Sequence, residues 1–225
     1  MVDGPTREWN GMVIPGAGVY QLDDAHKRIG FLAQHMMVSP VRGEFTKGSA
    51  TITVGEDPLQ SSIVATIQAE SIDTNNIDRD THLRSPDFLS VTDYPVLQFR
   101  STEVKWRGGN DDIFFWARLR GGGLGRRGST AYAPEGLDRP ASRFVLTGDL
   151  TIKDVTQQIE LEVNFGGARR DPSGQDIFGF SASADFNRES YGLRWNVALD
   201  RGGWLVGQTV RIEIAGEAIR QPDAA

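Results

Sequence analysis

The chain has 225 residues, 39% of them apolar, a length that suits one globular domain whose core folds without disulfides. Lysine and arginine number 24 against 30 aspartates and glutamates, so the net charge is −6 and nucleic acid is disfavoured as a partner. The absence of cysteine excludes disulfides, thiolate nucleophiles and thiolate zinc sites.

The first segment, residues 1–16, mixes glycine, proline and charged residues without periodicity, which predicts a flexible N-terminal arm. This segment lacks the basic start and long apolar stretch of a signal peptide. No later window reaches the roughly 18 unbroken apolar residues that a membrane span requires. We therefore expect a cytoplasmic protein without an integral membrane segment, unless a leader once preceded this sequence.

From Val19 onward, apolar residues return at every second position. This alternation predicts strands with one face on an apolar interior and the other in water, which is typical of antiparallel sheet. Turn residues separate the runs, as in "GEDPLQS", "DPSGQD" and "DRGG". The alternating residues are Ile29, Phe31, Ala33, Ala50, Ile52, Val54, Ile63, Ala65, Ile67, Ala69, Leu97, Phe99, Phe144, Leu146, Ile159, Leu161, Val163, Phe165, Val210, Ile212 and Ile214.

Eight or more such strands in one domain predict either a sandwich or a closed barrel of about eight to ten strands. The interior positions alternate phenylalanine with alanine and glycine. That mixture fills a sandwich core, and it also suits a barrel with room for a ligand. Periodicity alone does not choose between the two.

A single helix is predicted, within residues 75–89. Asn75 or Asn76 can cap its start, and Pro86 ends it by pushing the preceding residue out of helical geometry. Two favourable i,i+4 pairs are expected along it, Asp78 with His82 and Asp80 with Arg84. So short a helix needs tertiary support, which we expect across one open end of the sheet through four apolar anchors. These anchors are Ile77, Leu83, Phe88 and Leu89.

Five motifs, in this order, resemble the YceI-like family: "YQLDDAHKRIGFLAQHMMVSPVRGEF" from Tyr20, "SIDTNNIDRDTHLRSPDFL", "TGDLTIKDVT", "NRESYGLRWN" and "GGWLVG". The resemblance runs from Val19 to about Ile219. It implies an all-β fold, a lipocalin-like antiparallel β-barrel with one short helix near a barrel end. It also implies an apolar internal tunnel that binds polyisoprenoids or other long-chain amphiphiles without catalysis. On this basis residues 17–219 are the barrel domain and residues 220–225 a C-terminal tail.

Two departures from the family pattern stand out. An inserted loop, Gly121–Ser142, separates strands that a short turn usually joins, and we expect it to form either a flexible flap near a barrel end or a disordered segment. Lys47 and Trp204 replace an aromatic and an aliphatic residue respectively, which predicts a reshaped cavity.

Motifs for cofactors and catalysis are weak. Residues 123–128 satisfy G-x-G-x-x-G, but Pro134 and Pro140 follow instead of a helix, so we interpret them as a loop rather than a dinucleotide site. The "GFSAS" sequence at residues 179–183 lacks the closing glycine of a nucleophile elbow and follows a strand pattern. Paired carboxylates lie in turns and caps, where acidic residues are common anyway. We therefore predict no cofactor and no catalytic residue.

The three histidines do not form an evident metal site. His26 and His35, if carried by one strand, stand about 30 Å apart on opposite faces. His82 with Asp78 could offer two ligands, but Arg79 and Arg84 would compete for the carboxylates. We predict structural, hydrogen-bonded histidines and no metal.

Candidate ligand-binding residues are the inward-facing apolar positions together with polar residues near the helix. We expect His82 and Arg84 to meet the polar head of a bound amphiphile. The candidates are Ile29, Phe31, Ala33, His35, Phe45, Ile52, Ile63, Ile67, His82, Arg84, Phe88, Leu97, Phe99, Phe165, Phe180 and Trp195.

Three functions remain open. The first is non-catalytic binding, sequestration or carriage of a long-chain isoprenoid, such as an isoprenoid quinone, or of a related fatty amphiphile. The second is a cofactor-free barrel enzyme, a cyclase or isomerase acting on a polyketide or polyene, which would gain rate from orientation in the same cavity. The third is a structural or stress protein without a ligand. An exposed strand edge would also allow a homodimer.

Overall fold

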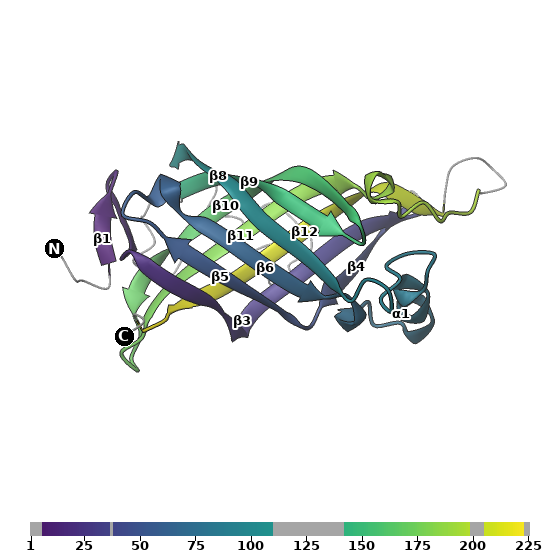
Figure 1. Ribbon diagram of the computed structural model, residues 1–225, viewed down its shortest axis with the longest axis horizontal. Helices are drawn as coiled ribbons and strands as arrows, with labels where there is room; N and C mark the ends of the chain where they lie inside the picture. Colours follow the sequence, from purple (N-terminus) through teal and green to yellow (C-terminus); the bar gives the residue numbers. More distant parts are fainter. Residues whose placement is uncertain (1–5, 37, 110–141, 199–204, 223–225) are drawn as a thin grey trace, which may run out of the picture.

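A computed structural model describes residues 6–36, 38–109, 142–198 and 205–222 of the chain. Within them, eight antiparallel strands form a closed barrel (Figure 1). In order around the wall these strands are β3 (Gly18–His35), β5 (Gly48–Val54), β6 (Ser62–Gln68), β8 (Val96–Gly109), β9 (Ser142–Ile152), β10 (Val155–Arg170), β11 (Asp176–Asn187) and β12 (Val206–Arg220). Pairing between β12 and β3 closes the ring, which excludes the open sandwich.

The remaining elements lie at the ends of the barrel or extend its sheet beyond the ring. β4 (Ser39–Phe45) pairs with the second half of β3, and β7 (Ile72–Asp73) pairs with β4. The others are β1 (Thr6–Trp9), β2 (Met12–Pro15), the short 3₁₀ turns η1 (Pro58–Gln60), η2 (Ala69–Ser71) and η3 (Arg188–Tyr191), and the helix α1 (Ile77–Arg84). The predicted lipocalin-like antiparallel barrel with one short helix near an end is confirmed.

The alternation of side chains explains the strands. In β10, Ile159 and Leu161 are buried, whereas Glu160 and Glu162 between them are exposed. Successive residues of a strand point to opposite faces, so this pattern turns one face of the strand inward along the wall. The burial of the inward face stabilises the barrel by roughly 25 cal/mol per Å² of apolar surface.

Residues 6–15 form a two-stranded hairpin, β1 with β2, where the sequence pattern predicted a flexible arm. The turn consists of Asn10 and Gly11, with φ of 47° and 76°. Positive φ at both central residues defines the type I′ turn, whose twist matches that of the strands it joins. The Asn-Gly dipeptide is therefore the local signal for this hairpin.

The helix α1 follows its predicted signals at both ends. The Asn76 side chain accepts a hydrogen bond from Arg79 N and caps the start, and Ser85 before Pro86 is extended. The predicted pairs along the helix are wrong: His82 contacts Asp87 at 3.0 Å, and the Asp80 carboxylate accepts bonds from Thr74.

The expected anchor at Ile77 is also wrong, since this side chain is 84% exposed. The other three anchors do pack inward: Phe88 and Leu89 are buried, and Leu83 is partly buried against the main core cluster. Arg84 pairs with no helical carboxylate and donates instead to Glu70 O and Ile72 O, which fastens α1 to the chain before it.

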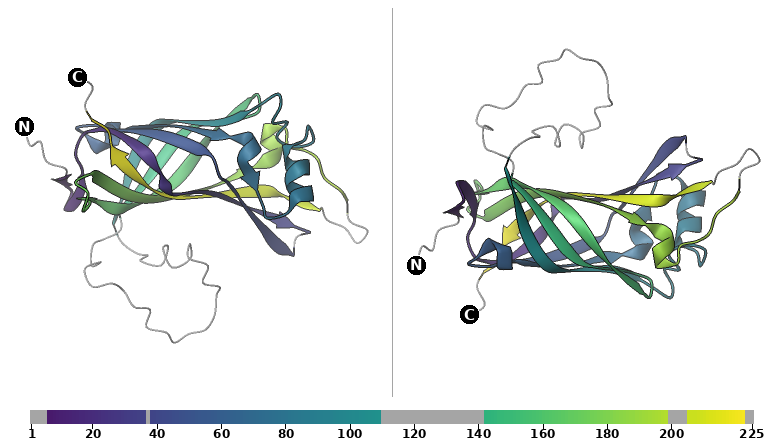
Figure 2. Two further views of the ribbon diagram at one scale, coloured as in Figure 1. Left: turned by 90° about the horizontal axis from the view of Figure 1, so that it is seen from below. Right: turned by 90° about the horizontal axis from the view of Figure 1, so that it is seen from above.

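The two ends of the barrel differ, as the views of Figure 2 show. The β1–β2 hairpin lies across one end, beside the start of β3 and the end of β12, while α1 lies at the other. Among the described residues there is no helix with the length and apolarity needed to span a bilayer. The inserted loop lies outside the described residues except for Ser142, as do the G-x-G-x-x-G segment and residues 223–225 of the tail.

Candidate functional site

The barrel encloses a cavity of about 220 Å³, to which every strand of the ring contributes side chains. They come mainly from the inward positions of the alternating runs. The lining residues are Ile14, Pro15, Leu22, Ile29, Ser49, Ala50, Ile52, Val54, Pro58, Ser61, Ile63, Ala65, Ile67, Phe99, Val104, Phe144, Leu146, Leu150, Ile159, Leu161, Val163, Phe165, Phe178, Phe180, Ala182, Ile212 and Ile214.

This lining is almost entirely apolar. Of the residues just named, only Ser49 and Ser61 carry a polar side chain, and none carries a charge or an imidazole. A polar group buried without a hydrogen-bond partner costs on the order of 1–3 kcal/mol, so this interior disfavours polar ligands. The cavity suits a hydrocarbon chain.

The hairpin covers one end of the cavity. Ile14 and Pro15 of β2 form part of the lining, and the Trp9 ring lies against Trp106 and Phe144 with centroids 5.3 and 6.1 Å away. The Arg7 guanidinium donates to Glu56 O at 2.5 Å and forms an ion pair with the same residue, in the loop before η1.

A buried tyrosine fixes the segment between this hairpin and β3. The Tyr20 side chain is fully buried, and its hydroxyl donates to Gly16 O at 2.9 Å. Burial raises the pKa of Tyr20, partly offset by the charge of Arg220, so the phenol stays neutral and can donate. The end of the cavity is therefore covered by anchored chain.

The opposite end is filled by side chains. Leu89, Tyr191 and Leu193 are buried in the main core cluster, and burial raises the pKa of Tyr191 to about 12. The His82 ring contacts Phe88 and Trp195 edge-on, with centroids 5.0 and 4.4 Å away. The cavity thus stops before it reaches the helix.

Seven of the sixteen predicted ligand-binding residues line the cavity. They come from β3, β5, β6, β8, β10 and β11 and are brought together across the barrel. These residues are Ile29, Ile52, Ile63, Ile67, Phe99, Phe165 and Phe180.

The other nine predicted residues lie elsewhere. Leu97 is buried in the main core cluster, and Phe31 and Phe45 are partly buried and pack against that cluster. His82, Arg84, Phe88 and Trp195 gather at the helix end, and the second half of β3 carries Ala33 and His35. Neither His82 nor Arg84 is among the residues that line the cavity.

Sequence reasoning missed several lining residues for two reasons. Leu146, Ile159, Leu161 and Ile212 alternate as predicted, but periodicity does not tell a cavity wall from a filled core. Ile14 and Pro15 lie in the segment expected to be a flexible arm. The Asn-Gly turn signal would have assigned them to a hairpin.

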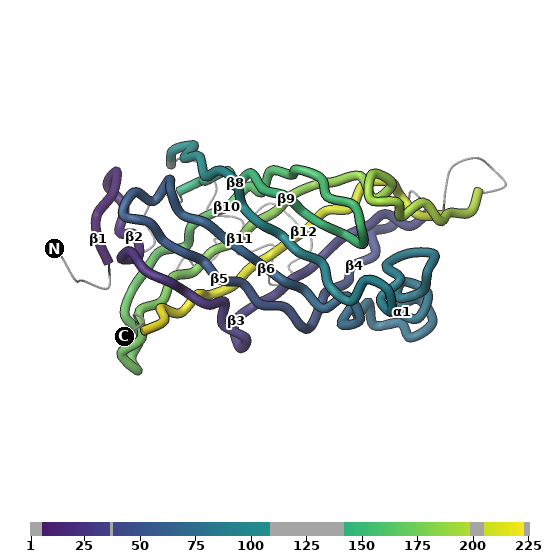
Figure 3. Tube along the Cα trace, in the orientation of Figure 1, coloured from purple at the N-terminus to yellow at the C-terminus, as the bar shows by residue number. Residues whose placement is uncertain are grey.

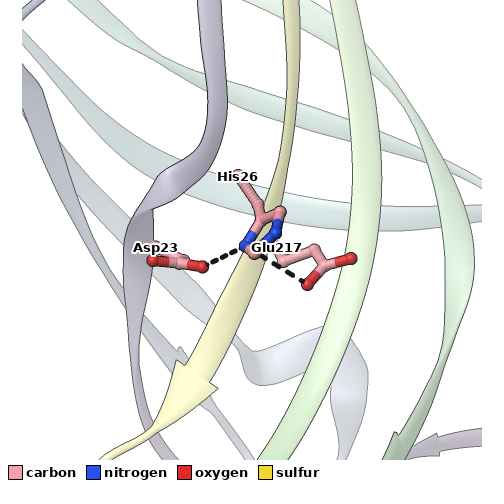
Figure 4. Close-up of side chains that lie close together, drawn as sticks. All are labelled: Asp23, His26 and Glu217. Atoms are coloured by element: carbon pink, nitrogen blue, oxygen red, sulfur yellow. Dashed lines mark hydrogen bonds and ion pairs between the residues drawn. The ribbon is translucent and has the colours of Figure 1, made fainter. Parts of the chain in front are cut away.

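A polar cluster lies on the outer wall, where Asp23 and His26 of β3 meet Glu217 of β12 (Figure 4). Their ligand atoms lie within 4.8 Å of one another, and His26 Nδ1 stands 2.6 Å from Asp23 and 4.0 Å from Glu217. The hydrogen bond to Asp23, with the charge of Glu217, raises the pKa of His26, and the same bond lowers the pKa of Asp23. The cluster could hold a metal ion or, equally, a proton on His26.

Comparison with known proteins gives one consistent result. The model of the YceI-like domain family matches residues 20–218. A UPF0312 protein of Staphylococcus epidermidis is 32% identical over 200 residues, which cover 88% of this chain and 95% of that protein. A UPF0312 protein of Staphylococcus aureus is 28% identical over 200 residues, which again cover 88% of this chain and 95% of that protein.

Solved structures share the barrel. A polyisoprenoid binding domain from Saccharophagus degradans has a TM-score of 0.59 at 12% identity, covering 92% of this chain and 100% of that one. Burkholderia cenocepacia BcnA has a TM-score of 0.60 at 18% identity, with coverage of 87% and 98%. The Campylobacter jejuni YCEI protein has a TM-score of 0.58 at 22% identity, with coverage of 84% and 90%. At these identities the likeness concerns the fold.

Proposed function

This chain belongs to the YceI-like domain family, as its motifs predicted, and we propose that its barrel binds one long apolar molecule, a polyisoprenoid or a similar long-chain amphiphile. The observation that carries the proposal is the cavity lining, in which Ser49 and Ser61 are the only polar residues among those that the structure describes. The ligand class is supported by the Saccharophagus degradans homologue, a polyisoprenoid binding domain.

Affinity in such a cavity comes from chain length. Each buried methylene contributes roughly 0.8 kcal/mol, so a long chain binds tightly without polar recognition. The described lining offers no acidic, basic or imidazole group for proton transfer, and catalysis there would depend on orientation alone. Sequestration or carriage is therefore the role we favour.

The size of the cavity bears on how the ligand fits. Its volume of about 220 Å³ lies below the roughly 300–1,000 Å³ of typical ligand pockets. We therefore expect lining rings such as Phe99 and Phe180 to change rotamer when a long chain enters. We expect the cavity to be wider with ligand than without.

Organic extraction of the purified protein followed by mass spectrometry tests the proposal. Ala65→Phe fills the cavity from β6, and its matched control is Val64→Phe, at the adjacent residue, which is 39% exposed. The wild type and Val64→Phe should release a long-chain lipid, and Ala65→Phe should release severalfold less while remaining folded by circular dichroism. Equal lipid content in the two variants, or no lipid in any of them after incubation with prenols and fatty acids, would refute interior binding.

A further inference from the structure

The barrel wall has a gap between β3 and the chain that runs from β4 to β5. β3 pairs with β5 from Gly18 to Gln21 and with β4 from Gly30 onward. Between these two ladders, within the described chain, no backbone pairing joins residues 22–29 of β3 to residues 45–50. The trace of β3 bends outward midway along its length at this point (Figure 3).

A polar hollow of about 480 Å³ lies over this gap. Its lining contrasts with that of the interior cavity, because it contains two lysines, one aspartate, hydroxyl groups and an amide. The residues are Asp24, Lys27, Thr46, Lys47, Gly48, Ser49, Thr66 and Gln68. Ser49 lines both the hollow and the apolar cavity, so the two spaces border the same residue of β5.

Only backbone separates the two spaces at Gly48. A Cβ added to Gly48 would lie 2.6 Å from Ile29 Cδ1 and 3.4 Å from Ile67 Cγ1, and both isoleucines line the cavity. The Gly48 carbonyl, in turn, accepts a hydrogen bond from Lys27 Nζ of the hollow. An ammonium group and the apolar cavity wall thus lie on either side of a single residue.

Lys27 is a part-buried charge with an exposed partner. Its side chain is only 10% exposed, while the Asp24 side chain with which it forms an ion pair is 87% exposed. An ammonium has three N–H donors, and the bonds to Asp24 and Gly48 account for two of them. Lys47 is 3.9 Å from Glu70, and both of these side chains are largely exposed.

We propose that this hollow binds the anionic head, a carboxylate or a phosphate, of the amphiphile whose chain occupies the cavity. The inference rests on the proposed function and names the ligand class more narrowly. Lys27 binds the head by a charge-assisted hydrogen bond, with Lys47 and the hydroxyls of Thr46 and Thr66 around it. The chain passes beside Ser49 into the interior, where no strand pairing needs to break.

Binding of three matched probes tests this site: geranylgeranyl phosphate, geranylgeranoic acid and geranylgeraniol, which share a chain and differ in the head. At least one of the two anions should bind the wild type about tenfold more tightly than the alcohol does. This is the difference expected when the head forms a hydrogen bond with a charged group. Lys27→Met should remove that difference by lowering the affinity for the anions far more than the affinity for the alcohol. The two anions distinguish a phosphate head from a carboxylate head.

Asp24→Asn should act in the opposite direction, because it frees Lys27 from its exposed partner and raises anion affinity. This variant keeps the proposal testable if Lys27→Met fails to fold. Lys105→Met, an exposed lysine on β8, is the control and should leave the preference intact. Two results would overturn the proposed head site but not the binding of the chain in the cavity. One is equal affinity of the wild type for all three probes, and the other is a preference for the anions that stays unchanged in both Asp24→Asn and Lys27→Met. Failure of every probe to bind overturns the proposed function as well.

Discussion

Arg188 is the most deeply buried charged residue among those described, with 2% of its surface exposed. Its guanidinium donates to the carbonyls of Gly207 at 2.8 Å and Trp195 at 3.1 Å, and also to those of Leu193 and Val206. Burial lowers the pKa of Arg188, and the nearby charge of Glu189 offsets this in part. This one side chain therefore joins η3, the segment after it and the start of β12.

Arg188→Met should cost about 3 kcal/mol or more in the free energy of unfolding, because several buried carbonyls lose a charged donor. Chemical denaturation measures this loss. The control is Arg211→Met, since Arg211 is 45% exposed and its contacts are weak: ion pairs of 3.8 and 3.9 Å with Asp185 and Glu213, which contribute under about 1 kcal/mol, and one long hydrogen bond of 3.5 Å to Ser183 Oγ. Similar losses in the two variants would contradict the role of Arg188.

His26 should titrate above its ordinary pKa of 6.5, because the Asp23 carboxylate accepts a hydrogen bond from the protonated ring. The raised pKa means that the pair stabilises the fold below about pH 6.5, and that this contribution disappears as the pH rises through the folded pKa. At acid pH the limit of this stabilisation is set by Asp23, whose pKa is lowered. The contribution of the pair disappears as the pH falls through the pKa of Asp23 in the folded protein.

NMR titration of the histidine rings checks this shift. Asp23→Asn should bring the His26 midpoint down toward its ordinary value. Asp24→Asn, at the adjacent residue that pairs with Lys27, should leave it in place. A His26 midpoint that stays the same in both variants would show that Asp23 does not stabilise the protonated ring.

At the scale of elements, the β1–β2 hairpin is a separate unit that covers one end of the barrel. Trp9→Ala removes two aromatic contacts of about 0.5–1.5 kcal/mol each, so local opening should become about tenfold more frequent. Hydrogen exchange should quicken in the amides of β1 and β2 and stay unchanged in β9 and β10. Glu8→Ala, an exposed position in the same hairpin, is the control. Uniform acceleration across the barrel would contradict a local unit.

Elements whose signals are local could be predicted from the sequence. The alternation of β10 and the Asn76 and Pro86 boundaries of α1 act within a few residues. The gap beside Gly48 could not be predicted, because it depends on which strands pair with each half of β3. The cluster at His26 likewise needs Glu217, which is distant in sequence and adjacent only through the pairing of β12 with β3.

At the scale of the whole molecule, the closed ring divides its interior into two parts. The half beneath the hairpin holds the apolar cavity, and the half beside α1 is packed with side chains such as Phe31 and Tyr191. Both halves have the same alternating pattern, so the sequence predicted inward positions without separating wall from filling. This explains why seven predicted residues line the cavity while Leu97 lies in the core and Phe31 and Phe45 pack against it.

The central claim is that the interior of the barrel receives a hydrocarbon chain, and the affinity for a series of straight-chain primary alcohols tests it most directly. A neutral head keeps the measurement independent of Lys27. Affinity should rise about fourfold for each added methylene and level off when the cavity is full. An affinity that does not change with chain length would contradict the claim.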